Sequence, residues 1–80
     1  MPGLRRMSGR ELVAVLQIFG FESISQRGSH IKLRRTAPNG VRQTLIVPEH
    51  PELDIGTLRA ILRQASRYIP MEDLQPHFYR

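Results

Sequence analysis

One histidine of this sequence stands among the groups that phosphodiester chemistry uses. His30 is followed at alternate positions by Lys32 and Arg34, and it is preceded by Arg27-Gly28-Ser29. An imidazole with an ordinary pKa of about 6.5 accepts or donates a proton at neutral pH, and cations offset the charge that develops on a phosphate. Gly28 has no Cβ, so its backbone can approach a phosphate closely. These residue types suit metal-independent cleavage of RNA.

Three short strands are expected to hold this histidine. Strand-forming residues occupy 21–25, 29–34 and 41–47, and turn-forming residues separate them at 26–28 and 36–40. The short turns predict an antiparallel meander of three strands.

Alternation along the second strand decides which way His30 points. Successive side chains of a strand point to opposite faces of the sheet, so Ile31 and Leu33 share one face. His30, Lys32 and Arg34 then form a row on the other face. If helices cover the apolar face, this basic row lies on the open one.

Two amphipathic helices flank the strands. Ser8 and Glu11 have the spacing of a capping box, which predicts a helix over 9–19, and Asp54 is placed to cap a second helix over 55–67. The expected apolar stripes are Leu12, Val13, Leu16 and Phe19 on the first helix, and Ile55, Leu58, Ile61, Leu62 and Ala65 on the second. The order α-β-β-β-α predicts an α+β fold in which both helices pack on one face of a three-stranded antiparallel sheet.

The length of 80 residues suits a single domain. We expect residues 1–7 to form a flexible leader and residues 68–80 a C-terminal tail. Residues 71–74 have room for one helical turn, which Pro76 limits because proline lacks a backbone N–H.

The charge of the chain is +5, and all of the excess lies in its first half. Residues 1–40 carry seven Lys or Arg against two acids, whereas residues 41–80 carry five of each. This distribution favours an anionic partner for the first half. The chain has no cysteine, no secretory signal and no long apolar run, so we expect a cytoplasmic protein without a membrane segment.

Each candidate has a plainer interpretation beside the functional one. From spacing alone, an ordinary exposed histidine on a polar strand face is the commoner explanation of His30. Arg59, Arg63 and Arg67 recur every fourth residue, which indicates either a solvated helix face or a row of phosphate or protein contacts. His50 lies in a loop without neighbouring ligands. The histidines and acids lack metal-ligand spacing, so the sequence predicts neither a metal site nor a cofactor.

Several segments together resemble the HicA toxin family, in this order and spacing. The resemblance runs from about residue 8 to residue 67, and the leader through Met7 lies outside it. The segment after the second helix, Ser66 to Arg80, is longer and more aromatic than the short tail of the family. The segments that carry the resemblance are Ser8-Gly9-Arg10-Glu11-Leu12, Gly20-Phe21-Glu22, Arg27-Gly28-Ser29-His30, Val47-Pro48-Glu49-His50 and the helix Gly56 to Ala65.

The resemblance implies a fold like that of the double-stranded RNA-binding domain. It also implies an mRNA endoribonuclease that arrests translation until a HicB-type antitoxin binds and covers its site. The catalytic histidine of the family corresponds to His30, with Gly28 and Ser29 as its companions in the motif.

The resulting hypothesis is a toxin that cleaves single-stranded or loosely structured mRNA without a metal. His30 would transfer the proton, and Arg27, Lys32 and Arg34 would stabilise the phosphate, with Arg59 and Arg63 as further RNA contacts. The second proton carrier is left open between water, Lys32 and His50. Two rival hypotheses are a non-catalytic RNA-binding module of the same fold and an adaptor that binds an acidic protein through its basic helix.

Overall fold

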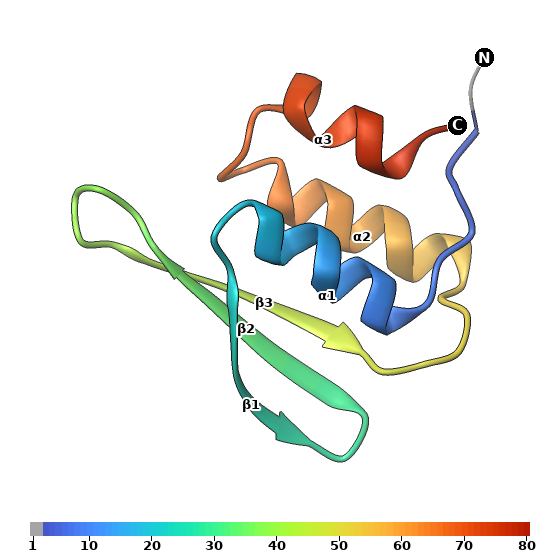
Figure 1. The fold of residues 1–80 in the computed structure, drawn as a ribbon, viewed down its shortest axis with the longest axis horizontal. Coiled ribbons are helices and arrows are strands. Elements are labelled where there is room, and N and C mark those ends of the chain that lie inside the picture. Colours follow the sequence, from blue (N-terminus) through green and yellow to red (C-terminus); the bar gives the residue numbers. More distant parts are fainter. Residues whose placement is uncertain (1–2) are drawn as a thin grey trace.

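The computed structural model describes residues 3–80, which form three strands and three helices (Figure 1). The strands make one antiparallel sheet in the order β1-β2-β3. This arrangement confirms the α+β fold that the sequence predicts. The elements are α1 (Gly9–Ile18), β1 (Glu22–Arg27), β2 (His30–Thr36), β3 (Arg42–Pro48), α2 (Ile55–Ala65) and α3 (Met71–Phe78).

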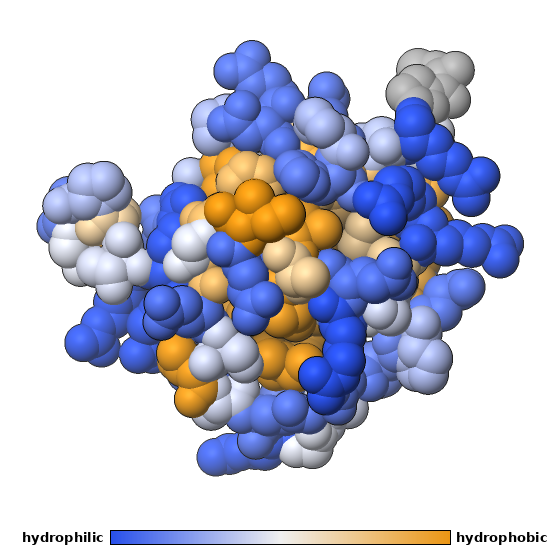
Figure 2. Space-filling view, viewed as in Figure 1, coloured by the Kyte–Doolittle hydropathy of each residue, from blue (hydrophilic) through white to orange (hydrophobic). Residues whose placement is uncertain are grey.

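The helices lie on one side of the sheet and enclose the core with it. In Figure 1, α1 and α2 run side by side over the sheet, and α3 lies beyond them, on their side away from the strands. Leu33 and Val47 of the sheet and Leu12 and Leu58 of the helices are at most 1% exposed. Hydrophilic side chains surround the surface seen in Figure 2, and apolar side chains are visible across the centre of the view and at its lower left.

The start of α1 is fixed by its cap and by a very close backbone approach. The backbone N–H of Glu11 donates to the Ser8 hydroxyl over 3.0 Å, and the backbone N–H of Ser8 donates to the Glu11 carboxylate over 2.9 Å, so the predicted capping box is present. Gly9 N–H donates to the carbonyl of His50, and a Cβ on Gly9 would stand 1.9 Å from the carbonyl oxygen of Pro48. Only glycine allows α1 to begin so close to the chain that leaves β3.

The hairpin between β1 and β2 is tighter than the sequence suggested. We expected the turn at 26–28, but β1 continues to Arg27, which pairs with His30, so only Gly28 and Ser29 form the turn. Gly28 has φ +58°, and no residue type other than glycine adopts a positive φ among residues 3–80. A two-residue turn with a positive φ at its first position and not at its second, Ser29, is the type II′ arrangement, which matches the twist of the paired strands.

The second helix begins as expected but buries a shorter stripe. Asp54 caps α2 by accepting a hydrogen bond of 2.8 Å from the backbone N–H of Thr57. The hydrogen bond from this N–H is the largest cause that lowers the pKa of Asp54, and the hydrogen bond from the Thr57 hydroxyl is the next. Both favour the charged carboxylate. Ile55, which we placed on the apolar stripe, is 44% exposed because it occupies the first helical position, at the edge of the core.

The C-terminal segment forms a full third helix, which corrects the expected tail with a single turn. α3 continues through Pro76 as far as Phe78. The proline removes one backbone donor from the helix, but Leu74 and Phe78 on either side of it are 0% exposed. Burial of these two large side chains offsets the missing hydrogen bond, since tertiary packing routinely outweighs local propensity.

The segment before α1 also packs, so the flexible leader that we expected needs correction for residues 4–7. Leu4 pairs with Tyr79 as an isolated antiparallel bridge, and the N–H of Arg5 donates to the carbonyl of Phe78 over 2.7 Å. Met7 is 2% exposed and belongs to the core. Residues 1 and 2 of the expected leader lie outside the described residues.

Arg35 joins the far ends of the two long helices to the sheet. Its guanidinium donates to the carbonyl of Phe19 at the end of α1 over 3.0 Å and to that of Tyr68, just after α2, over 2.9 Å. It also donates to Gln43 on β3 and lies over the ring of Phe21, 5.2 Å from its centre. One cation therefore satisfies carbonyls that two helix ends leave unpaired.

Candidate active site

His30 is the first residue of β2 and stands on the face of the sheet that the helices leave open. Its neighbours along the strand, Ile31 and Leu33, are 4% and 0% exposed beneath the helices. His30 is exposed, and Lys32 and Arg34 are half-buried. The alternation that the sequence predicts along β2 is therefore confirmed.

A shallow hollow of about 350 Å³ surrounds this histidine. Arg27 lies directly opposite His30 in the register of the hairpin, and Ser25 and Ile46 lie on either side of Lys32. Directly opposed side chains of an antiparallel pair have Cβ atoms about 4.5–5.5 Å apart. The lining residues are Ser25, Arg27, His30, Lys32 and Ile46. The hollow thus combines one imidazole, two cations and a hydroxyl with an apolar wall.

Ser25 and Ile46 were missed from the sequence, and the reason differs for each. Simple alternation from the buried Phe21 places Ser25 on the helix side of β1. The register shifts between Ser23 and Ser25, since these two residues pair with consecutive residues of β2. This bulge turns Ser25 to the open face, beside Lys32. Ile46 could have been found, because it alternates with the buried Leu45 and Val47 on a strand that the sequence predicts.

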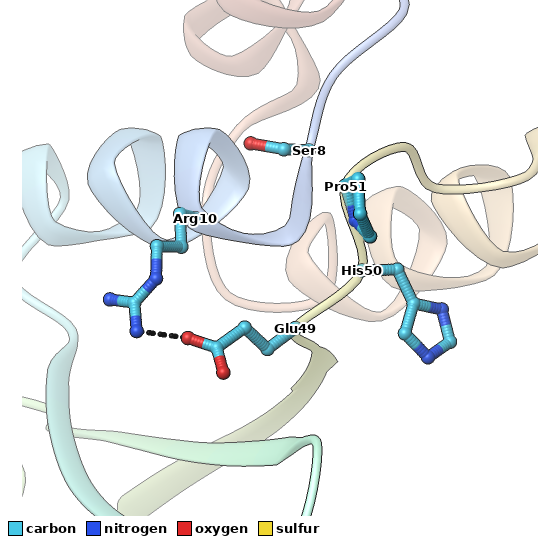
Figure 3. A pocket seen from close by; sticks show the side chains of 5 residues that line it. All are labelled: Ser8, Arg10, Glu49, His50 and Pro51. Atoms are coloured by element: carbon cyan, nitrogen blue, oxygen red, sulfur yellow. Dashed lines mark ion pairs between the residues drawn. The ribbon is translucent and has the colours of Figure 1, made fainter.

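A small polar network holds the turn that precedes His30. The N–H of Glu49 donates to the carbonyl of Ser29, and the Gln26 side chain donates to the Glu49 carboxylate over 2.9 Å and to the carbonyl of Gly28 over 3.0 Å. Arg10 of α1 forms an ion pair with the same carboxylate, and Figure 3 shows the two side chains pointing toward one another. The network ties the hairpin turn to the start of α1 and to the loop after β3.

The remaining predicted RNA contacts are not gathered in this hollow. Gly28 and Ser29 lie beside it in the turn, whereas Arg34 lines a second hollow further along β2. Arg59 and Arg63 are exposed on α2, on the helix side of the sheet. The structure therefore brings Arg27 and Lys32 together with His30 and places the two helix arginines on another surface.

The other two histidines lie apart from His30. His50 lines a separate hollow of about 410 Å³ with Ser8, Arg10, Glu49 and Pro51, and Figure 3 shows its ring pointing away from Glu49. His77 packs edge to face against Phe19, with ring centres 5.4 Å apart. Within residues 3–80, no three histidine or acidic side chains gather as a metal site would require.

The fold and the site together define a small basic α+β domain with a histidine between cations on an uncovered sheet. A family model described as the HicA toxin of bacterial toxin-antitoxin systems matches residues 9–66. The match covers most of the chain, so the protein belongs to the HicA toxin family, and it has the toxin role and the antitoxin partner that such systems imply.

Neither the curated proteins nor the solved structures that were compared contain a match to this chain. The family match ends within a residue of α2, so α3 and the segment before α1 lie outside it. None of the helices in the described part of the chain has the length and apolar character needed to cross a membrane.

Proposed function

We propose that this toxin is a metal-independent endoribonuclease that cleaves mRNA and arrests translation. The observation that carries the proposal is the hollow around His30, where an exposed imidazole stands between Arg27 and Lys32 on the open sheet face. Metal-independent cleavage of RNA needs a group that moves a proton and cations that stabilise a phosphate. The family to which the chain belongs supports the same chemistry.

The proposed step is an internal transfer at one phosphate of the RNA. His30 takes the proton of the ribose 2′-hydroxyl as the 2′ oxygen forms its bond to phosphorus. The bond from phosphorus to the 5′ oxygen of the next nucleotide breaks. Water that enters the open hollow donates a proton to this leaving oxygen and recovers one from the imidazolium of His30, which returns to its neutral form. Arg27 and Lys32 stabilise the charge on the phosphate, and the products are a 2′,3′-cyclic phosphate and a free 5′-hydroxyl. His50 takes no part, because it lines a different hollow.

We further propose how the toxin holds its RNA, how it is neutralised and where it acts. The turn residues Gly28 and Ser29 hold the RNA backbone near His30, and Arg59 and Arg63 contact more distant phosphates. A HicB-type antitoxin neutralises the toxin by covering the open face of the sheet. The toxin acts in the cytoplasm, where mRNA is translated, and it uses no small-molecule cofactor.

The test compares three purified proteins on unstructured RNA in the presence of EDTA: the parent, His30→Ala and His50→Ala. We expect His30→Ala to lose about 10²–10⁴-fold in cleavage rate, since this is the usual contribution of one general acid or base. His50→Ala is the matched control, because it removes an exposed imidazole from a different hollow, and it should cleave at the parental rate. RNA binding is measured in parallel.

Three results would contradict the proposal. Equal cleavage by the parent and His30→Ala would remove His30 from the reaction. Equal binding by both without cleavage would identify a non-catalytic RNA-binding module, the rival hypothesis. Loss of parental cleavage in EDTA would contradict the metal-independent route.

A further inference from the structure

A second hollow lies at the end of the sheet opposite the hairpin turn. β1 begins at Glu22, which pairs with Arg34, so the last residues of β2 run past β1 without a partner on that side. The resulting notch has a volume of about 270 Å³. Its lining residues are Gly20, Glu22, Ile24, Arg34, Arg35 and Thr36.

Arg34 lines this notch without forming an ion pair among residues 3–80. It belongs to the same row as His30 and Lys32 and is half-buried. The only ion pair within residues 3–80 joins Arg10 to Glu49, so Glu22 lies opposite Arg34 in the register of the strands without forming an ion pair with it. The Nε atom of Arg34 is buried without a hydrogen-bond partner among these residues.

The other lining groups are of kinds that bind the parts of a nucleotide. The Thr36 hydroxyl can both donate and accept hydrogen bonds. The Glu22 carboxylate accepts hydrogen bonds, such as the one that a ribose 2′-hydroxyl donates. Ile24 lies at the bulge and is 44% exposed. Ile46, at 42% exposed, offers a similar apolar surface beside Lys32. Cation, hydroxyl and apolar side chains thus continue from the His30 hollow into the notch.

We propose that the notch binds a second nucleotide of the same RNA strand, with Arg34 on its phosphate and Ile24 against its base. This inference rests on the proposed function and names the substrate as single-stranded RNA that lies along β2. Alternate residues of a strand are about 6.6 Å apart, which is comparable to the distance between successive phosphates of an extended chain. Lys32 and Arg34 are one such spacing apart, so a phosphate beside Lys32 and the next phosphate of the strand, beside Arg34, fit this row.

The test measures kcat/KM for a dinucleoside monophosphate and for oligonucleotides extended from it one nucleotide at a time, on either the 5′ or the 3′ side, in EDTA. The proteins are the parent, Arg34→Gln and the matched control Arg6→Gln, which removes one exposed arginine from the segment before α1. We expect extension in one direction to raise parental kcat/KM about tenfold, as one charged hydrogen-bonded contact would. Arg34→Gln should abolish this gain, so that its kcat/KM no longer rises with the length of the substrate, and Arg6→Gln should show the parental gain.

The outcomes separate this inference from the proposed function. No gain on extension by the parent, or an equal effect of Arg34→Gln on short and long substrates, would overturn the second subsite. Preference for the same sequence annealed to its complement would overturn the single-stranded substrate. If the parent cleaves nothing, the proposed function fails, and the subsite is tested by binding alone. Arg34→Gln should then weaken binding of the long oligonucleotides and not of the short one, and equal affinities would overturn the subsite.

Discussion

Arg34 and Arg35 are neighbours on β2 and have the same side chain, yet they lie in opposite surroundings. Arg35 points under the helices, where three hydrogen bonds and the ring of Phe21 hold it. Arg34 points to the open face and forms no ion pair within the described residues. A strand places consecutive residues on opposite faces, so position along β2 alone separates a structural cation from one that is free to bind an anion.

The same division runs through the whole sheet. The helix side holds the buried apolar residues and the capped helix ends, whereas the open side holds His30 and its cations. Stability is therefore concentrated on one face of the sheet and the proposed chemistry on the other. Substitutions on the two faces should have separable effects, and the following predictions test that separation.

The largest expected contrast is between Leu33 and Lys32. Leu33 is 0% exposed, so Leu33→Ala should lower the free energy of unfolding by about 2–5 kcal/mol, the usual loss for a buried leucine. Lys32→Ala should lower it far less, because Lys32 is only half-buried on the open face and its side chain has no hydrogen-bond or ion-pair partner among residues 3–80, while RNA cleavage should fall. Urea denaturation of both variants measures this difference, and similar losses of stability would contradict the division between the faces.

The next contrast is between the two neighbouring arginines. Arg35→Met keeps an apolar stem in place of the aliphatic part of the side chain but leaves the carbonyls of Phe19 and Tyr68 unpaired, so we expect a loss of about 2–3 kcal/mol in unfolding free energy. Arg34→Met should cost less than about 0.5 kcal/mol. Thermal unfolding of the two variants provides the comparison. Equal stabilities would show that Arg35 does not tie the helix ends to the sheet.

A smaller effect on the helix side depends on pH. The backbone N–H of Ser8, and then its hydroxyl, lowers the pKa of Glu11 below its ordinary value of 4.5. A carboxyl with a lowered folded pKa stabilises the fold above its unfolded pKa, and this contribution is lost as the pH falls through the folded value. The difference in melting temperature between the parent and Glu11→Gln should therefore be constant above about pH 6 and shrink below pH 4.5. A difference that stays the same from about pH 3 to about pH 7 would contradict this expectation.

The smallest expected effect concerns the outer surface of α2. If Arg59 and Arg63 bind phosphates, replacing both by Gln should weaken RNA binding and flatten its dependence on salt by about 0.7 for each phosphate that the protein no longer neutralises. Affinity measured over a range of salt concentrations gives this slope. An unchanged slope would show that Arg59 and Arg63 do not bind phosphates, and RNA binding would then be limited to the open face of the sheet.

Most of the architecture could be predicted from local patterns. The capping residues Ser8 and Asp54 mark where two helices begin, and alternation of Ile31 and Leu33 with polar residues orients β2 correctly. Such signals act between residues close in sequence, so they can be read without knowing the fold. The position of His30 on the open face follows from them.

The features that sequence patterns missed depend on interactions between distant residues. The bulge at Ile24 changes the face of Ser25, but it exists only in the pairing of β1 with β2. α3 contains a proline, and it is stabilised by burial of Leu74 and Phe78 in a core that local propensity does not describe. The sequence does not distinguish Arg35 from the other basic residues of β2, because the carbonyls that it binds, those of Phe19 and Tyr68, are distant in sequence.

The pairing of the two chain ends has a practical consequence for protein engineering. Gly3 and Leu4 lie beside Tyr79 and Arg80, and the N–H of Arg80 donates to the carbonyl of Gly3 over 3.0 Å. A short linker would therefore suffice to join residue 80 to residue 3. New termini could open in the exposed turn at Pro38-Asn39-Gly40, because loop tips tolerate such cuts best. The chain is thus a candidate for circular permutation, with the open face of the sheet left intact.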